Sequence, residues 1–175
     1  MKIKPYQQGS LDGYCGMYCM VNIVHYIDGP ISTDNALHLL SKLLAEMHVK
    51  VSVDRRLTDG VSHTEIIYML RLLKRSYPIR FKKAFPKKRK VTLQEYWSVL
   101  SEFIHQTGGL ALICAEGYHD HWTLVRGITN RSLLLFDSDG MGWLPRKHCT
   151  TGEILPNRRH YISPYHTLLI WRDRP

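Results

Sequence analysis

The pattern of apolar residues changes near residue 108, and this change constrains the fold more than any other feature of the chain. Before it, apolar residues recur at the three- and four-residue spacing of amphipathic helices; after it, short apolar runs are separated by turn residues. Helices followed by strands are typical of an α+β domain rather than of alternating βαβ units. The 175 residues are therefore expected to form a single domain, residues 1–175, with a helical half and a sheet half.

Four helices are expected before this change. The first begins at Cys15 and ends before Asp28-Gly29-Pro30, and the second spans about residues 33 to 48. Capping boxes, in which a Ser or Thr and a Glu three residues later satisfy each other's backbone N–H groups, predict a third helix after Ser62 and a fourth after Thr92. The inward face of the second helix is predicted to carry Leu37, Leu40, Leu43, Leu44 and Met47.

Strands are expected after Gly108-Gly109, which closes the fourth helix. Residues 79–85 are a candidate for an earlier short strand, and residues 49–61 for a loop or a short strand. Four apolar runs predict the later strands: residues 110–114, 122–128, 132–136 and 166–171.

Cys15, at the start of the first predicted helix, is the best candidate for a chemically active residue. The positive end of a helix dipole favours a thiolate, which is the nucleophilic form of cysteine. An upstream glutamine can donate its side-chain amide to a developing oxyanion, and Gln8 is preferred over Gln7 for this role. Cys19, one helical turn after Cys15, is expected to be a core residue.

A candidate base and its orienting carboxylate come from the predicted strands. His121 lies directly before the second apolar run, and Asp137 directly follows the third. On adjacent strands, the imidazole of His121 can act as a general base and the carboxylate of Asp137 can orient it. His119 and Asp139, each two residues away, are the alternatives for these two roles.

With Gln8, Cys15-Gly16, His121-Trp122 and Asp137 in this order, the chain resembles the papain-like superfamily of cysteine peptidases. Within it, the pattern is similar to that of the bacteriocin-leader peptidases at the front of some ABC transporters, although that group often has Asp-Pro where this chain has Asp137-Ser138. The resemblance implies a papain-like α+β fold, with an N-terminal helical half packed against a C-terminal antiparallel sheet. It also implies that Cys15 is the nucleophile, His121 the base, Asp137 the orienting residue and Gln8 the oxyanion donor.

The expected function is that of a cysteine hydrolase that cleaves a peptide or isopeptide bond in a protein or peptide substrate. Two alternatives use the same fold: a bacterial effector that acts as a deamidase, transglutaminase or amidase, and a catalytically silent binding module. No metal-ligand spacing, phosphate-binding loop or dinucleotide fingerprint is found in the sequence, so neither a metal nor another cofactor is expected.

The chain is basic, with 24 Lys and Arg against 15 Asp and Glu and a formal charge of +9. Much of the excess lies between Lys82 and Lys90, which is either a solvated loop or a docking site for an acidic partner. Nucleic acid is not the expected partner, because no aromatic ladder accompanies the cluster. No apolar run is long enough to span a membrane and no signal peptide is recognised, so we expect a cytoplasmic location, with specialised export as the alternative.

Overall fold

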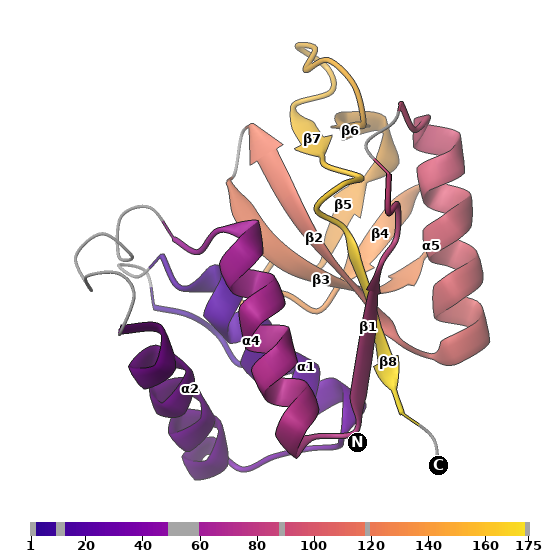
Figure 1. The fold of residues 1–175 in the computed structure, drawn as a ribbon. Helices are drawn as coiled ribbons and strands as arrows, with labels where there is room; N and C mark the ends of the chain where they lie inside the picture. Colours follow the sequence, from indigo (N-terminus) through magenta and orange to yellow (C-terminus); the bar gives the residue numbers. More distant parts are fainter. Residues whose placement is uncertain (1–2, 10–12, 49–59, 88–89, 118–119, 174–175) are drawn as a thin grey trace.

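The four predicted helices are all present in the computed structural model, which describes residues 3–9, 13–48, 60–87, 90–117 and 120–173 (Figure 1). Among these residues, no helix is long and apolar enough to cross a membrane. The helices are α1 Cys15–Ile27, α2 Thr33–His48, α4 His63–Ser76 and α5 Leu93–Thr107, with a short 3₁₀-helix, η1, at Arg146–His148.

The ends of α4 and α5 agree with the capping signals in the sequence. The hydroxyl of Ser62 accepts a hydrogen bond from the backbone N–H of Glu65 at 3.3 Å, and the Glu65 carboxylate accepts from the backbone N–H of Ser62 at 2.7 Å. Thr92 accepts in the same way from the backbone N–H of Glu95 at 3.1 Å. Gly108, with a φ of 63°, ends α5 in the left-handed conformation that glycine adopts readily.

The described strands form one sheet with the main order β1-β8-β2-β3-β4-β5, in which every neighbouring pair is antiparallel. In addition, β7 pairs antiparallel with β2 and parallel with β6. The predicted α+β fold with helices packed against an antiparallel sheet is therefore confirmed. The strands are β1 Ile79–Lys83, β2 Leu110–Gly117, β3 His121–Ile128, β4 Ser132–Leu135, β5 Trp143–Pro145, β6 Cys149–Thr150, β7 His160–Ile162 and β8 Leu168–Arg172.

Three of these strands, β5, β6 and β7, are missing from the sequence prediction. Each has only two or three residues, which is too short for a period of two to be recognised. Their places in the sheet come from pairing with longer neighbours. Of the segment 49–61, predicted to be a loop or a short strand, residues 49–59 lie outside the described residues.

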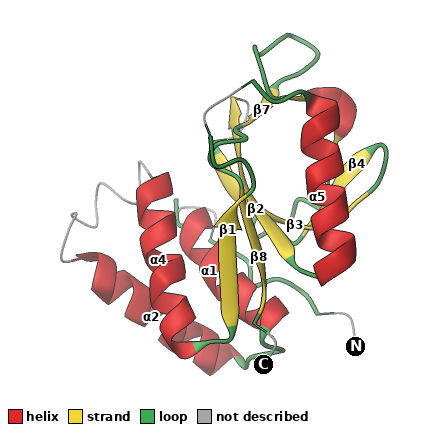
Figure 2. Ribbon diagram, turned by 45° about the vertical axis from the view of Figure 1, so that its right-hand side comes forward, coloured by secondary structure: helices red, strands yellow, loops and turns green. Residues whose placement is uncertain are grey.

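Both faces of the sheet are covered by helices. Leu110 and Leu112 of β2 belong to the core formed with α1, α2 and α4, whereas Ala111 and Ile113 belong to the core formed with α5. Figures 1 and 2 show α5 on the opposite side of the sheet from the other three helices. The separation into a helical half and a sheet half is thus less complete than expected, since β1 precedes α5 and forms an edge of the sheet.

The predicted inward face of α2 is partly wrong. Leu43 and Met47 are buried, but Leu37 is 57% exposed, and its place in the core is taken by Ala36 and Leu39. A leucine-rich helix offers two adjacent apolar stripes to its neighbours. The stripe that is buried in the core shared with α1 contains the small residue Ala36.

This assignment of the buried stripe can be tested with two substitutions in the same helix. We expect Leu43→Ala to lower the free energy of unfolding by about 2–5 kcal/mol, because it leaves a cavity in the core. Leu37→Ala, the matched control, should change it by less than about 0.5 kcal/mol. Urea unfolding followed by circular dichroism measures both, and equal losses would contradict the assignment.

Candidate active site

Cys15 is the first residue of α1 and is only 7% exposed. The end of the helix is enclosed by the segment before α4, because a Cβ atom at Gly16 would overlap the side chain of Val61. On the other side lies β3, where the indole N–H of Trp122 donates a hydrogen bond to the carbonyl of Val61 at 2.8 Å. Glycine after the cysteine therefore permits the close packing that surrounds the thiol.

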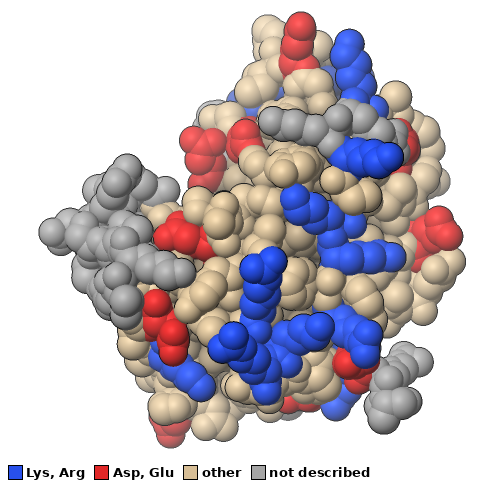
Figure 3. Space-filling view, in the orientation of Figure 1, with Lys and Arg blue, Asp and Glu red and all other residues tan. Residues whose placement is uncertain are grey.

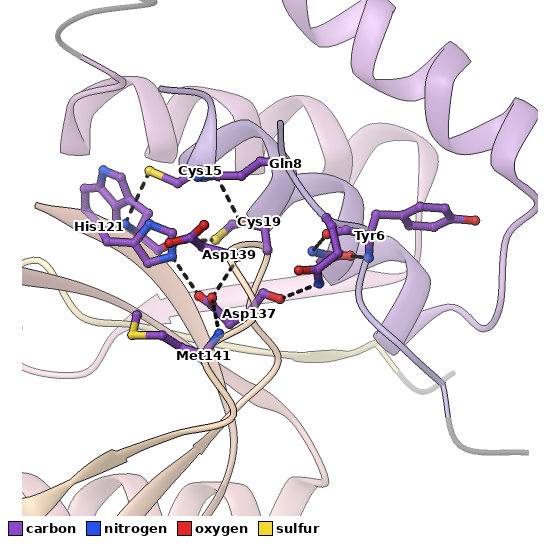
Figure 4. Close-up of polar contacts among 12 residues, drawn as sticks. Tyr6, Gln8, Cys15, Cys19, His121, Asp137, Asp139 and Met141 are labelled. Atoms are coloured by element: carbon purple, nitrogen blue, oxygen red, sulfur yellow. Dashed lines mark hydrogen bonds and ion pairs between the residues drawn. The ribbon is translucent and has the colours of Figure 1, made fainter. Parts of the chain in front are cut away.

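His121 and Asp137 meet beside this thiol (Figure 4). His121 begins β3, and Asp137 lies two residues after the end of the neighbouring strand β4. His121 Nε2 and Asp137 Oδ2 are 2.7 Å apart, and the two side chains are 9% and 0% exposed. The other carboxylate oxygen, Oδ1, accepts hydrogen bonds from the backbone N–H groups of Asp139 at 2.8 Å and Met141 at 3.1 Å.

The contacts of this pair favour its charged form. Burial by itself would lower the pKa of His121, but hydrogen bonds to Asp137 and Cys15 outweigh that effect and raise this pKa to about 10. Burial would likewise raise the pKa of Asp137, yet its hydrogen bond with His121 holds that pKa below its ordinary value. Since Nε2 of His121 faces Asp137, the second ring nitrogen, Nδ1, is the one left for Cys15. At neutral pH the site therefore places an imidazolium between a sulfur and a carboxylate.

Two thiols of α1 hold the backbone of Trp122, the residue after His121. The N–H of Trp122 donates to Sγ of Cys15 at 3.5 Å, and the thiol of Cys19 donates to the carbonyl of Trp122 at 3.3 Å. Burial keeps the pKa of Cys19 well above its ordinary value, so this thiol stays protonated and can donate. Cys19 is buried as expected, but its contact with the strand beside His121 was not predicted.

The two glutamines at the N-terminus have different partners. The side-chain N–H of Gln7 donates to the backbone carbonyls of Asp137 at 3.0 Å and Pro5 at 3.4 Å. The side-chain oxygen of Gln8 instead accepts from the hydroxyl of Ser138 at 3.3 Å, and its backbone N–H donates to the carbonyl of Ser138 at 2.9 Å. Within the described residues no partner binds the side-chain N–H₂ of Gln8, and Figure 4 shows this side chain pointing toward Cys15.

Asp139, the alternative to Asp137, takes a different part in the site. Asp139 is exposed and contributes its backbone N–H, rather than its carboxylate, to the site. His119 lies outside the described residues. No group of three or more His, Cys, Asp or Glu side chains in the described part of the chain is arranged to hold a metal ion.

The fold resembles a known peptidase domain. Neither a protein-family model nor a curated protein matches the chain. Among solved structures, the chain is similar to the peptidase domain of Streptococcus ComA, described as a bifunctional ABC transporter involved in a quorum-sensing pathway. The TM-score is 0.53 at 14% sequence identity, over 95% of this chain and 93% of that one. The predicted papain-like fold, similar to the bacteriocin-leader peptidase group, is thus confirmed at the level of the fold.

The charged pair predicts a specific dependence of stability on pH. The pKa of His121 is about 10 in the folded chain and about 6.5 when unfolded, so the stabilisation by its proton is complete below pH 6.5 and is lost as the pH rises toward 10. We expect the free energy of unfolding of the wild type to fall more steeply between pH 6.5 and 10 than that of His121→Gln. Denaturant unfolding across this range measures the difference, and parallel curves would contradict the charged pair.

Proposed function

We propose that the protein is a cysteine peptidase that cleaves a peptide or isopeptide bond, with Cys15 as its nucleophile. His121 is the acid and base, and Asp137 orients it. The observation that carries the proposal is the buried contact of 2.7 Å between His121 and Asp137, with Cys15 against the opposite side of the imidazole. The likeness to a peptidase domain supports the fold in which this chemistry is expected.

The proposed reaction begins from a Cys15 thiolate and a His121 imidazolium. The sulfur attacks the carbonyl carbon of the scissile amide, forming a C–S bond and a negatively charged oxygen. His121 gives its proton to the amine nitrogen as the C–N bond breaks, which leaves a thioester on Cys15. His121 then takes a proton from water, the resulting hydroxide attacks the thioester, and the sulfur leaves as a thiolate. The carboxylic acid product departs and the imidazolium–thiolate pair is restored.

Gln8 is the proposed donor to the oxyanion, together with the backbone N–H of Cys15. The hydroxyl of Ser138 holds the oxygen of the Gln8 amide and so determines which end of that amide remains for the substrate. Gln7 is a weaker candidate because its side-chain N–H binds backbone carbonyls. A donor fixed before the substrate arrives does not have to reorganise during the reaction.

Asp137 is proposed to act through His121 rather than on the substrate. Its Oδ2 binds Nε2 of the imidazole, while two backbone N–H groups hold its Oδ1. This arrangement fixes the ring with Nδ1 toward Cys15 and stabilises the positive charge on the ring.

Thiol labelling tests the nucleophile. We expect chloroacetamide to modify Cys15 faster than any other cysteine, because His121 lies against its sulfur. The other three cysteines are internal controls: burial raises the pKa of Cys114 and Cys149 to about 12 and that of Cys19 well above its ordinary value. Intact-mass spectrometry, with peptide mapping of the adduct, measures the rates.

His121→Ala should slow the labelling of Cys15 at pH 6 by at least about tenfold, and Asp137→Asn should have a smaller effect in the same direction. Labelling of Cys15 that is no faster than that of the other cysteines and is independent of His121 would show that the proposed nucleophile is wrong.

The two glutamines provide a matched pair for the oxyanion donor. We expect Gln8→Ala to lower kcat on a cleaved peptide by about 10²–10³-fold with little change in the rate of Cys15 labelling, because the donor acts on the transition state. Gln7→Ala should lower kcat much less. Mass spectrometry of products from a peptide library measures cleavage and also distinguishes it from deamidation, which adds about one mass unit, and from cross-linking. Equal losses in the two variants would contradict the assignment of Gln8.

A further inference from the structure

A row of packed aromatic side chains begins beside Cys15. The backbone N–H of Trp122 contacts the Cys15 sulfur at 3.5 Å, and the indole ring of Trp122 stacks on His63 with centroids 6.3 Å apart. His63, the first residue of α4, also contacts the rings of Tyr165 at 5.9 Å and His166 at 4.6 Å. These packed rings, which we call the wall, connect the surroundings of the proposed nucleophile to the turn between β7 and β8, and Trp122 within them is buried.

A pair of lysines stands at the far end of this wall. Lys83 Nζ lies over the ring of Tyr165 at 4.0 Å. Beside it, a pocket of about 330 Å³ is lined by Lys87 together with Tyr161, Tyr165 and His166. Tyr165 thus belongs both to the wall and to the pocket. Lys83 lies over Tyr165 and Lys87 lines the pocket to which Tyr165 belongs, and we call these two residues the cleft lysines after that pocket.

The cleft lysines are part of a larger basic surface. Figure 3 shows Lys and Arg gathered over α4, β1 and the segment that follows β1. Among these residues in the described parts of the chain, Arg80 forms an ion pair, with Asp173 at 2.7 Å. Lys82, which belongs to the same basic segment as Lys83, lies over Trp171 on the other face of the sheet and so belongs to a different surface. Several positive charges on the α4 side are therefore available to a ligand.

We propose that the substrate is a polypeptide with an acidic segment, and that Lys83 and Lys87 bind this segment while the scissile bond lies at Cys15. The proposal rests on the proposed function and specifies its substrate class. The contacts of 6.3, 5.9 and 4.0 Å that link Trp122 through His63 and Tyr165 to Lys83 place the lysines within several residues of extended chain from Cys15, at about 3.3 Å per residue. The acidic residues are therefore expected several positions from the bond that is cut.

The surface fits a polypeptide better than a nucleic acid or a membrane. The rings of the wall pack on one another, and Lys83 covers Tyr165, so they do not offer free faces for base stacking. The exposed large apolar residues of the described chain lie outside α4 and β1, and a cationic face without them lacks the side chains that insert into a bilayer. The wall also begins beside Cys15, which is the proposed nucleophile for the amide bond of a polypeptide.

Glu116, an acidic residue of the same pocket, restricts the positions at which the substrate can carry negative charge. Glu116 lines the same pocket and lies 3.5 Å from His166. A substrate carboxylate beside Glu116 is disfavoured by like charge, whereas one beside Lys83 or Lys87 is favoured. The substrate is thus expected to be uncharged next to the wall and acidic beyond it.

Binding of acidic peptides tests the proposal without requiring cleavage. The protein is the full chain with Cys15→Ala, and the probes are fluorescent peptides with three Glu, or three Gln, about five residues to either side of a central amide. We expect the Glu peptide with its charges on the correct side to bind at least about tenfold more tightly than its Gln counterpart at low salt, and the preference to shrink at 0.5 M NaCl.

Charge reversal identifies the surface. Lys83→Glu with Lys87→Glu should remove the preference for Glu, and Lys83→Gln with Lys87→Gln should reduce it about halfway. The matched control, Arg131→Glu with Lys147→Glu, makes the same change in net charge at exposed positions beyond β4 and β5 and should retain the preference. Urea unfolding of each variant and Cys15 labelling of its counterpart with Cys15 intact show whether the fold and site survive.

Each outcome has a defined meaning. Equal loss in the control variant, or no preference for Glu peptides, overturns the proposal. Tight binding of single-stranded RNA or of anionic lipid vesicles that depends on the cleft lysines, without a preference for Glu peptides, overturns it in favour of those ligands. If acidic peptides bind through the cleft lysines but no peptide is cut by the wild type, the surface stands and the proposed function fails.

Discussion

The contact between α1 and β3 is the interaction on which the candidate site depends. Cys15 and Cys19, one helical turn apart, bind the N–H and the carbonyl of Trp122. Because those two backbone groups are fixed by the helix, the orientation of β3 at its first residue, His121, is fixed as well. The indole of Trp122 adds a bond to Val61, so the same residue also holds the segment that covers the start of α1. Helix, strand and covering segment are therefore positioned together.

A buried ion pair is costly unless its remaining hydrogen-bonding groups are satisfied. The site meets this condition with backbone groups. The turn after β4 directs the N–H groups of Asp139 and Met141 to Asp137, and His121 binds its other oxygen. The charge is thus stabilised by the shape of the turn, and a change in that turn is expected to affect the imidazole as much as a change in Asp137 itself. The exposed Asp139 contributes to this turn through its backbone alone.

Local patterns in the sequence predicted those structural features that depend only on residues close together in the chain. The capping boxes at Ser62 and Thr92 and the glycine at 108 gave the ends of α4 and α5, because a cap is formed by residues within one helical turn. The buried stripe of α2 was predicted less well, since its choice depends on α1, and the strands β5 to β7 were missed because they are held by pairing rather than by their own pattern. The sequence also did not predict helices on both faces of the sheet, because the continuous apolar run of β2 indicates two buried faces without showing what covers them.

The sequence by itself determined the order of helices and strands and the short set of polar residues from which a site could be built. Only the tertiary structure decided among them: it brought Asp137 rather than Asp139 to His121, and gave Gln7 and Gln8 different partners through Asp137 and Ser138. It also joined His63, which the sequence placed only at the start of a helix, to Tyr165, and Tyr165 to Lys83. The physical reason is that these contacts join residues far apart in the chain, so their geometry is set by the packing of whole elements and leaves no local pattern to read.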